Sequence, residues 1–332
     1  MTTLTELDDN VVARIEAATE RMQRAHKAAS GVIFGQDEVI TRALITILAG
    51  GHALLIGVPG LAKTLLVETL GTVLGLDAKR IQFTPDLMPS DIIGAEVLED
   101  APGQRRSFRF IKGPIFTQLL MADEINRASP KTQSALLQAM QEHHVTVAGQ
   151  RHDTPTPFHV LATQNPLEQE GTYPLPEAQL DRFLLQIDVS YPDLAAERRM
   201  LYATTGNESR TVETVLNVPD LLAIQRVVRQ MPVPDKVVEA ILKLVRSARP
   251  NTGADADTDR FVAWGPGPRA SQALMLAVRA RALLEGRLAP SVDDVVAMAD
   301  PVLKHRMALS FAARAEGQDL GAVIARLASN LE

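Results

Sequence analysis

The sequence predicts an α/β protein with a five-stranded parallel sheet, followed by a smaller all-helical domain. Strand-like apolar segments alternate with helix-like segments up to about residue 192, and such alternation indicates a parallel sheet. A glycine-rich loop follows the first of these strands and leads into a helix. Beyond residue 192, helical patterns dominate and strand signals nearly vanish. We therefore expect an α/β domain over residues 1–192 and a helical domain over residues 193–332.

Composition excludes several classes of protein. The 332 residues are too many for one small core and favour two domains. The formal net charge of −6 does not imply a general attraction to nucleic acid. No run of about 18 apolar residues is present to span a membrane, and the polar, acidic start lacks the pattern of a signal peptide. The absence of cysteine excludes disulfides, thiolate zinc sites and cysteine nucleophiles, so we expect a cytoplasmic protein.

The first domain contains the predicted strands and the helices between them. Five apolar segments are typical of strands: residues 53–56, 80–84, 115–122, 158–163 and 183–189. Helical spacing or helix-forming composition marks four segments: residues 10–30, 37–48, 65–70 and 129–142. Ser129, followed by Pro130, has the residue type expected at the N-cap of the last of these helices.

Two irregular stretches interrupt this alternation. Residues 85–114 are rich in proline and glycine, which predicts an insertion of short strands around a turn near Pro102 and Gly103. The alternating segment Ser107–Phe110 is expected to be one of these strands. A second hairpin is expected over residues 143–158.

The second domain is predicted to contain five helices: residues 194–205, 219–230, 234–249, 267–285 and 291–309. Residues 251–260 are acidic and turn-rich, so we expect a surface loop there. Asp255, Asp257 and Asp259 have a spacing similar to that of a calcium-binding loop. The glycine and closing glutamate of such a loop are missing, and this favours the surface loop.

The glycine-rich loop has the pattern of a phosphate cradle. Its residues are Gly57, Val58, Pro59, Gly60, Leu61, Ala62, Lys63 and Thr64, and Leu65 continues the helix. Backbone N–H groups and the positive end of the helix would face a triphosphate. Lys63 can reach the β- and γ-phosphates, and the Thr64 hydroxyl can bind Mg²⁺. Ala62 departs from the generic pattern, which has glycine there, so an ordinary Pro-Gly turn remains an alternative.

Acidic and amide side chains follow two later strands. Asp123 and Glu124 follow a buried strand, where Asp123 can hold Mg²⁺ and Glu124 can act as general base toward the attacking water. The alternative is that both acids cap the following helix. Asn165 ends a neighbouring strand and can hydrogen-bond the γ-phosphate or the water, although Asn-Pro is also common in turns. These strand ends meet at the ligand-binding edge of α/β sheets.

Four motifs resemble the MoxR family of AAA+ ATPases. They are residues 57–64, LLMADEINRASP at 119–130, ATQNP at 162–166 and PEAQLDRF at 176–183. The resemblance is dense from about Val32 to Phe183 and looser through Trp264–Ala270. Ala62 is usual in this family. The resemblance implies a P-loop AAA+ core followed by a helical lid.

The family resemblance also implies residue roles. Residues 57–64 would be the Walker A loop, Asp123 and Glu124 the Walker B pair, and Asn165 sensor 1. Arg182 would be the arginine finger that reaches the γ-phosphate of a neighbouring subunit, and Arg269 would be sensor 2. The segment that commonly lies near adenine matches residues 32–36, in which Val32, Ile33 and Gln36 are the expected binding residues. Residues 85–114 would be the helix-2 insertion, and about 143–158 the hairpin before sensor 1.

A physical argument also supports a role for Arg182 and Arg269 at the γ-phosphate. Phosphoryl transfer spreads negative charge over the γ-phosphate oxygens, and a permanently charged guanidinium can bind two of them. The alternative for Arg182 is a salt bridge to Asp181 or Glu177. For Arg269 it is a solvated charge on a helix face, and whether Arg269 would act within its own chain or on a neighbour stays open. Arg127, just after the Walker B pair, could also point to a subunit interface.

The resemblance implies an oligomeric ATPase, expected to be a hexameric ring, that uses ATP and Mg²⁺ to remodel or activate a client protein or to insert metal into it. A partner with a von Willebrand factor A domain is expected; the client is not identified by the sequence. The alternative is a nucleic-acid remodelling motor of the same clade. The net acidity and the lack of an evident basic, aromatic-rich segment argue against that alternative.

Overall fold

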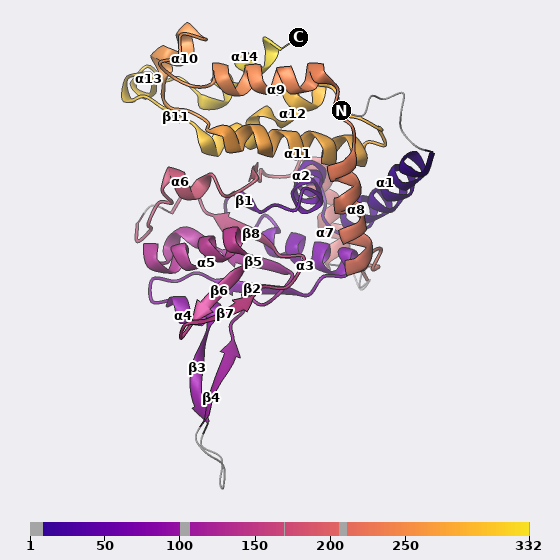
Figure 1. Ribbon diagram of the computed structural model, residues 1–332, viewed down its shortest axis with the longest axis vertical. Helices are drawn as coiled ribbons and strands as arrows, with labels where there is room; N and C mark the ends of the chain where they lie inside the picture. Colours follow the sequence, from indigo (N-terminus) through magenta and orange to yellow (C-terminus); the bar gives the residue numbers. More distant parts are fainter. Residues whose placement is uncertain (1–8, 100–106, 169, 206–210, 332) are drawn as a thin grey trace.

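A five-stranded parallel sheet forms the centre of the computed structural model, which describes residues 9–99, 107–168, 170–205 and 211–331 (Figure 1). The strand order is β2-β5-β8-β1-β9, and all four neighbouring pairs are parallel. The strands are β1 (Ala53–Ile56), β2 (Ala78–Gln82), β5 (Leu119–Asp123), β8 (His159–Gln164) and β9 (Leu185–Asp188). The predicted α/β fold with a following helical part is confirmed.

Helices cover both faces of the sheet. Side chains of β1 alternate between two apolar clusters, with Leu55 in one and Leu54 in the other. The cluster around Leu55 includes α1 (Asp9–Ser30), α2 (Asp37–Leu48) and α3 (Lys63–Leu74), together with helices from the second half of the chain. The cluster around Leu54 includes α5 (Pro130–Glu142). Because the lid helices share a core with α1 and α2, the domain division at residue 192 stays a prediction.

Several predicted boundaries in the first half were wrong by a few residues. β2 starts at Ala78 and ends at Gln82, whereas residues 80–84 were expected. β5 starts at Leu119, not at residue 115, because the preceding residues form a turn in which the Thr117 hydroxyl donates to the carbonyl oxygen of Asp77 (2.8 Å). The helix after the loop continues to Leu74, well past the predicted residue 70.

The insertion over residues 85–114 contains a short helix that the sequence analysis missed. Helix α4 (Pro89–Ile93) begins where the Asp91 carboxylate accepts a hydrogen bond from the backbone N–H of Met88 (2.8 Å). Strands β3 (Gly94–Glu99) and β4 (Ser107–Lys112) then form an antiparallel hairpin that projects from the body of the protein (Figure 1). The expected turn near Pro102 and Gly103 lies outside the described residues.

The second predicted hairpin is present. It consists of β6 (His144–Val147) and β7 (Gln150–Asp153), which pair antiparallel. Ser129 is the N-cap of α5, and its side chain accepts a hydrogen bond from the backbone N–H of Thr132. A short helix, α6 (Glu177–Leu180), precedes β9.

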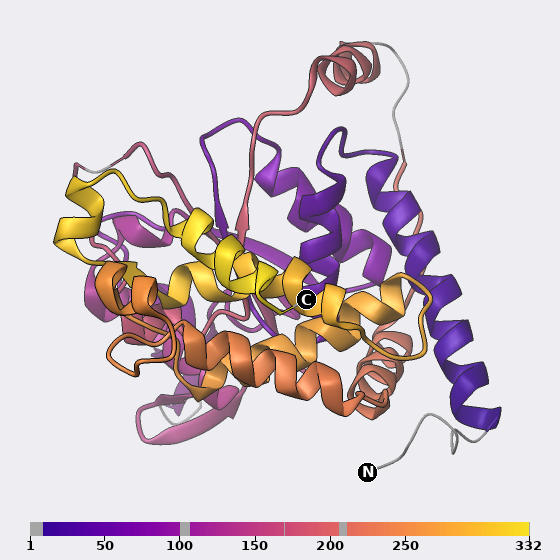
Figure 2. The ribbon, with the colours of Figure 1, turned by 90° about the horizontal axis from the view of Figure 1, so that it is seen from above.

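The helices of the second half are α7 (Leu194–Thr205), α8 (Val218–Gln230), α9 (Asp235–Ser247), α10 (Ala256–Phe261), α11 (Pro268–Leu284), α12 (Val292–Leu303), α13 (Phe311–Ala315) and α14 (Leu320–Ser329). Helices α9 to α14 lie together over one end of the sheet, whereas α8 runs beside α1 and α2 (Figures 1 and 2). In Figure 2, α7 stands at the margin of the molecule, apart from the other lid helices. Among the residues the structure describes, no helix is long and apolar enough to cross a membrane.

Three expectations for this half were wrong. The five predicted helices do not include α13 and α14, which follow the last predicted range. The predicted loop 251–260 contains the start of α10, because Asp255 caps that helix and also pairs with Arg326 (2.9 Å). The predicted helix 291–309 ends at Leu303 and continues as a 3-10 turn, η3 (Lys304–Arg306). After this turn, β11 (Ala308–Leu309) pairs with β10 (Val262–Trp264).

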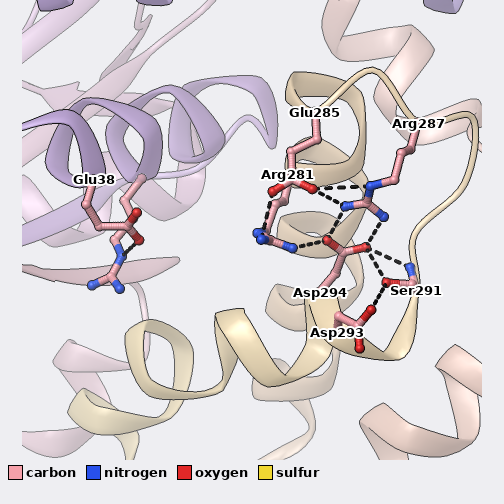
Figure 3. Close-up of polar contacts among 8 residues, drawn as sticks. Glu38, Arg281, Glu285, Arg287, Ser291, Asp293 and Asp294 are labelled. Atoms are coloured by element: carbon pink, nitrogen blue, oxygen red, sulfur yellow. Dashed lines mark hydrogen bonds and ion pairs between the residues drawn. The ribbon is translucent and has the colours of Figure 1, made fainter.

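A buried carboxylate ties α11 to α12 in the lid (Figure 3). Asp294 is fully buried and accepts hydrogen bonds from Arg281, from Arg287 Nη1 (2.6 Å) and from the backbone N–H of Ser291 (2.7 Å). Burial favours the neutral acid, but these donors outweigh it and hold the pKa of Asp294 below its ordinary value. The surrounding donors of the lid therefore stabilise the ionised form of the Asp294 carboxyl group.

Replacing Asp294 by asparagine is expected to lower the free energy of unfolding by about 2–3 kcal/mol, because two guanidinium groups lose their charged acceptor. Chemical denaturation followed by circular dichroism measures this change. The control is Asp293→Asn on the exposed side of the same helix, which should change stability by less than about 0.5 kcal/mol. Equal effects of the two substitutions would contradict the structural role of Asp294.

Candidate active site

The glycine-rich loop connects β1 to α3 at the carboxyl end of the sheet. Gly60 has φ = 82° and Ala62 has φ = 56°, so both lie in the left-handed region. Glycine is usual at such positions because a side chain there costs about 1–2 kcal/mol. Ala62 therefore adopts the left-handed conformation that glycine would adopt, and the loop carries the strain of a side chain at this position.

Lys63 is the first residue of α3, and its ammonium group folds back over the loop. Its Nζ donates to the carbonyl oxygens of Gly57 and of Val58, the latter at 3.2 Å. Burial lowers the pKa of Lys63 from its ordinary value, and Asp123 and Glu124 oppose this shift. The ammonium group therefore lies between the loop carbonyls and the two carboxylates, where a bound phosphate would contact it.

A cleft of about 770 Å³, here called the loop cleft, opens above the glycine-rich loop. Its size suits a nucleotide or another small molecule. The predicted site residues that line it are Val32, Ile33, Gln36, Pro59, Gly60, Leu61, Ala62, Lys63, Thr64, Leu65, Asp123, Glu124 and Asn165. Gly57 and Val58 approach the cleft through the carbonyl groups that bind Lys63.

Asp123 is the last residue of β5 and is buried. One carboxylate oxygen accepts a hydrogen bond from the Thr163 hydroxyl (2.5 Å), and the other accepts one from Arg80 Nη2 (2.6 Å). Carboxylate and hydroxyl oxygens are the ligands that Mg²⁺ prefers, and the Asp123 carboxylate lines the same cleft as Thr64. The donor set therefore fits a magnesium ion bound by Thr64 and Asp123.

Glu124 directly follows β5 in a left-handed conformation, with φ = 54°. Its backbone N–H donates to the Thr163 hydroxyl (2.9 Å). Its Oε2 accepts hydrogen bonds from Gln82 Nε2 (2.7 Å) and from Arg127 Nη1 (2.9 Å). The hydrogen bond and charge of Glu124 raise the pKa of Arg127. The carboxylate is held in the cleft by both side chains, and the helix-capping alternative does not describe it.

Asn165 follows β8 and is buried at the floor of the cleft. Its Oδ1 accepts a hydrogen bond from the backbone N–H of Leu167 (3.1 Å). The residue therefore takes part in the Asn-Pro turn and also faces the cleft. No acceptor among the described residues binds its side-chain amide NH₂, which can therefore donate to a molecule in the cleft.

Further residues of the loop cleft were missed by the sequence analysis. They are Arg80, Gln82, Tyr191, Pro192, Glu197, Met200 and Thr204, whereas Phe34 belongs to the segment 32–36 that was expected near adenine. Arg80 and Gln82 could have been found from the strand order, because β2 pairs with β5 and Gln82 stands opposite Asp123. No sequence signal places α7 beside the cleft.

The two remaining predicted residues, Arg182 and Arg269, do not line the loop cleft. They lie together at a separate hollow of about 260 Å³, here called the arginine hollow, which Asp181 and Arg306 also line. Arg269 Nη1 lies 3.9 Å from an oxygen of Asp181. Within the described part of the chain, Arg182 makes no ion pair or side-chain hydrogen bond, so the expected alternative pairing with Asp181 or Glu177 is not formed.

Comparisons with known proteins identify the family. One family model, "ATPase family associated with various cellular activities (AAA)", matches residues 52–185, and another, "AAA lid domain", matches residues 254–327. Chaperone MoxR1 of Mycobacterium tuberculosis is 42% identical over 91% of this chain and 79% of its own length. Protein MoxR of Paracoccus denitrificans is 32% identical over 87% of this chain and 89% of its own length.

A solved structure agrees with the sequence relatives. The crystal structure of a protein from Cytophaga hutchinsonii, described as a candidate ATPase, has a TM-score of 0.87 at 37% identity and covers 95% of each chain. Sequence similarity over most of the chain, both family models and this structure all support one assignment. The chain belongs to the MoxR family of AAA+ ATPases.

Proposed function

We propose that the protein binds ATP with Mg²⁺ in the loop cleft and hydrolyses it to ADP and phosphate. The observation that carries this proposal is the convergence of Lys63, Asp123, Glu124 and Asn165 on one cleft above a phosphate loop. A cation, a metal-binding carboxylate, a second carboxylate and an amide at one strand edge are the parts that phosphoryl transfer to water requires.

Each residue has a distinct proposed task. Backbone N–H groups of residues 57–64 and the Lys63 ammonium bind the β- and γ-phosphates. Thr64 and Asp123 would hold Mg²⁺, which supplies charge neutralisation at the phosphates. Asn165 donates to the γ-phosphate or the attacking water, and Glu124 accepts a proton from that water. Val32, Ile33 and Gln36 contact the base side of the nucleotide.

Glu124 must be free to reach water before it can act. In the structure its Oε2 accepts hydrogen bonds from Gln82 and Arg127, and these two donors occupy the position of a water on that oxygen. Proton transfer therefore requires Glu124 to exchange at least one of these partners for the water. Arg127 contacts Glu124 of its own chain, so its proposed role is to hold this carboxylate and not to reach a neighbouring site.

Arg182 and Arg269 have a different proposed role, because they lie outside the loop cleft of their own chain. Among the described residues, Arg182 is not paired with an acid, and Arg269 makes only the 3.9 Å contact with Asp181. We infer that both guanidinium groups are presented to the nucleotide of a neighbouring subunit. Such an arrangement makes hydrolysis dependent on assembly and supports a ring, for which we propose a hexamer.

The cellular task is also a proposal. The relative from Mycobacterium tuberculosis is named a chaperone, and this supports a role in remodelling, activating or metal-loading a client protein. A partner with a von Willebrand factor A domain remains the expected adaptor. The expected cytoplasmic location stays a prediction.

ATP turnover measured at increasing protein concentration tests this function. We expect turnover per chain to rise with concentration in parallel with oligomer mass from analytical ultracentrifugation, because each site is completed by a neighbour. Single- and double-stranded DNA at physiological salt should leave turnover unchanged. Constant turnover per chain in a monomeric sample would contradict the shared site, and strong stimulation by DNA would favour a nucleic-acid motor.

A further inference from the structure

The backbone around Arg182 is held by the lid. Residues 181–184 connect α6 to β9 at the edge of the sheet, directly below the lid helices (Figure 1). Phe183 is fully buried, which fixes one neighbour of Arg182 in the core. Asp181, the other neighbour, directs its carboxylate to arginines of the lid. The Arg182 side chain, in contrast, has no such partner in the described residues.

Arg306 makes the main contacts of the lid with this segment. It belongs to η3 and is 2% exposed. Its Nε donates to Asp181 Oδ1 (2.7 Å), and Nη2 donates to the carbonyl oxygens of Phe183 (2.6 Å) and Asp181 (3.4 Å). Its Nη1 donates to the carbonyl oxygens of Leu184 (3.1 Å) and Val302 (2.6 Å). The five acceptors match the five N–H groups of a guanidinium.

These acceptors lie on both sides of Arg182 in the chain. Four of the five belong to residues 181, 183 and 184, and the fifth belongs to the lid itself. His305, the preceding residue of the lid, adds a hydrogen bond of 3.0 Å to the carbonyl oxygen of Phe183. A shift of η3 would therefore carry the backbone of Arg182 with it.

We propose that Arg306 is a positioning residue for the arginine finger, which sets the place of Arg182 and so couples the orientation of one subunit's lid to hydrolysis in the next subunit. The inference rests on the proposed function, in which Arg182 acts on a neighbouring nucleotide. Arg306 itself is 2% exposed, and acceptors of its own chain take up its N–H groups, so it has no donor left for a nucleotide. A lysine cannot replace it, since an ammonium has three donors and no planar fork.

The first test is the substitution Arg306→Lys, which keeps the charge and loses the fork. We expect kcat to fall about 10²-fold, because a displacement of about 1 Å in a catalytic group has an effect of this size. Binding of a fluorescent ATP analogue should be unchanged, because the loop cleft of the same chain is intact. Lys304→Met is the matched control: it removes an ion pair from η3 to Asp188 without touching residues 181–184, and it should keep kcat within about threefold.

The second test shows on which subunit Arg306 acts. Chains with Arg306→Lys and chains with Lys63→Ala are coexpressed under two tags, so that only mixed assemblies are purified and assayed. The Lys63→Ala chains cannot use their own cleft but offer an intact Arg182 to a neighbour. We expect turnover above that of either variant alone, because the intact clefts of the Arg306→Lys chains then face a correctly placed finger.

A reference assembly separates this inference from the proposed function. It combines Arg182→Ala with Lys63→Ala in the same way. If the reference assembly recovers turnover and the Arg306→Lys assembly does not, Arg306 does not position the finger. If neither recovers, or if two unmodified tagged chains do not copurify, the shared site itself is contradicted and the inference fails with it. If Arg306→Lys does not fold, Asp181→Asn replaces it in both tests. This substitution weakens the hydrogen bond between Arg306 and the Asp181 side chain.

Discussion

Replacement of Arg182 by alanine is expected to lower ATP turnover about 10³–10⁵-fold, the range in which an arginine finger acts. The γ-phosphate oxygens gain negative charge in the transition state, and the guanidinium of a neighbour stabilises that charge more than it stabilises bound ATP. The effect should therefore fall on kcat. Nucleotide affinity, measured by equilibrium titration, should stay within about threefold of the unmodified protein, because Arg182 does not line the loop cleft of its own chain.

The matched control for this substitution is Arg260→Ala. Arg260 is an exposed lid arginine that pairs with Glu316. Neither residue lines the loop cleft or the arginine hollow, so turnover should be unchanged. Oligomer mass should be measured for both variants, because loss of assembly would also stop hydrolysis. Full turnover of an assembled Arg182→Ala protein would contradict the proposed finger.

Replacement of Glu124 by glutamine is expected to stop hydrolysis while ATP remains bound. The substitution keeps the size of the side chain and its capacity to hydrogen-bond, but a neutral amide cannot take the proton of the attacking water. A loss of about 10²–10⁴-fold in kcat is expected, as for other general bases. Single-turnover hydrolysis with equilibrium binding measures both quantities on the same sample.

Glu168→Gln is the control for this second prediction. Glu168 Oε2 also lies 3.9 Å from Arg127 Nη1, and its charge favours a higher pKa of Lys63, but Glu168 does not line the loop cleft. It should therefore leave kcat within about threefold of the unmodified protein. Unchanged turnover of Glu124→Gln would show that this carboxylate is not the base, and loss of ATP binding would indicate a structural role.

The sequence predicted the parts of the candidate site that depend on local chemistry. A four-residue apolar strand, a glycine-rich turn and a lysine-threonine helix start are consecutive in the chain, so the local geometry of the loop could be predicted without the fold. Asp123 and Glu124 could also be placed from the sequence, because they follow a strand and the carboxyl ends of parallel strands lie at one edge of the sheet. Bounds such as those of α2 followed from helical spacing and from the break at Gly50.

Features that depend on distant contacts could not be predicted. Arg80 contacts Asp123 and Gln82 contacts Glu124 because β2 pairs with β5, and the sequence does not reveal that strand order. The early start predicted for β5 failed because an apolar run cannot be distinguished from a buried turn by composition. The separation of Arg182 from the loop cleft could not be predicted either, since it follows from how the lid packs on residues 181–184.

The most direct measurement of the central claim, that each active site is shared between two chains, is the turnover of assemblies that mix Arg182→Ala with Lys63→Ala. Each variant alone should be nearly inactive, the first for lack of the finger and the second for lack of the phosphate-binding lysine. In mixed assemblies, intact clefts of Arg182→Ala chains meet intact fingers of Lys63→Ala chains. We predict turnover above the sum of the two separate variants; purified mixed assemblies that stay as inactive as their components would contradict the shared site.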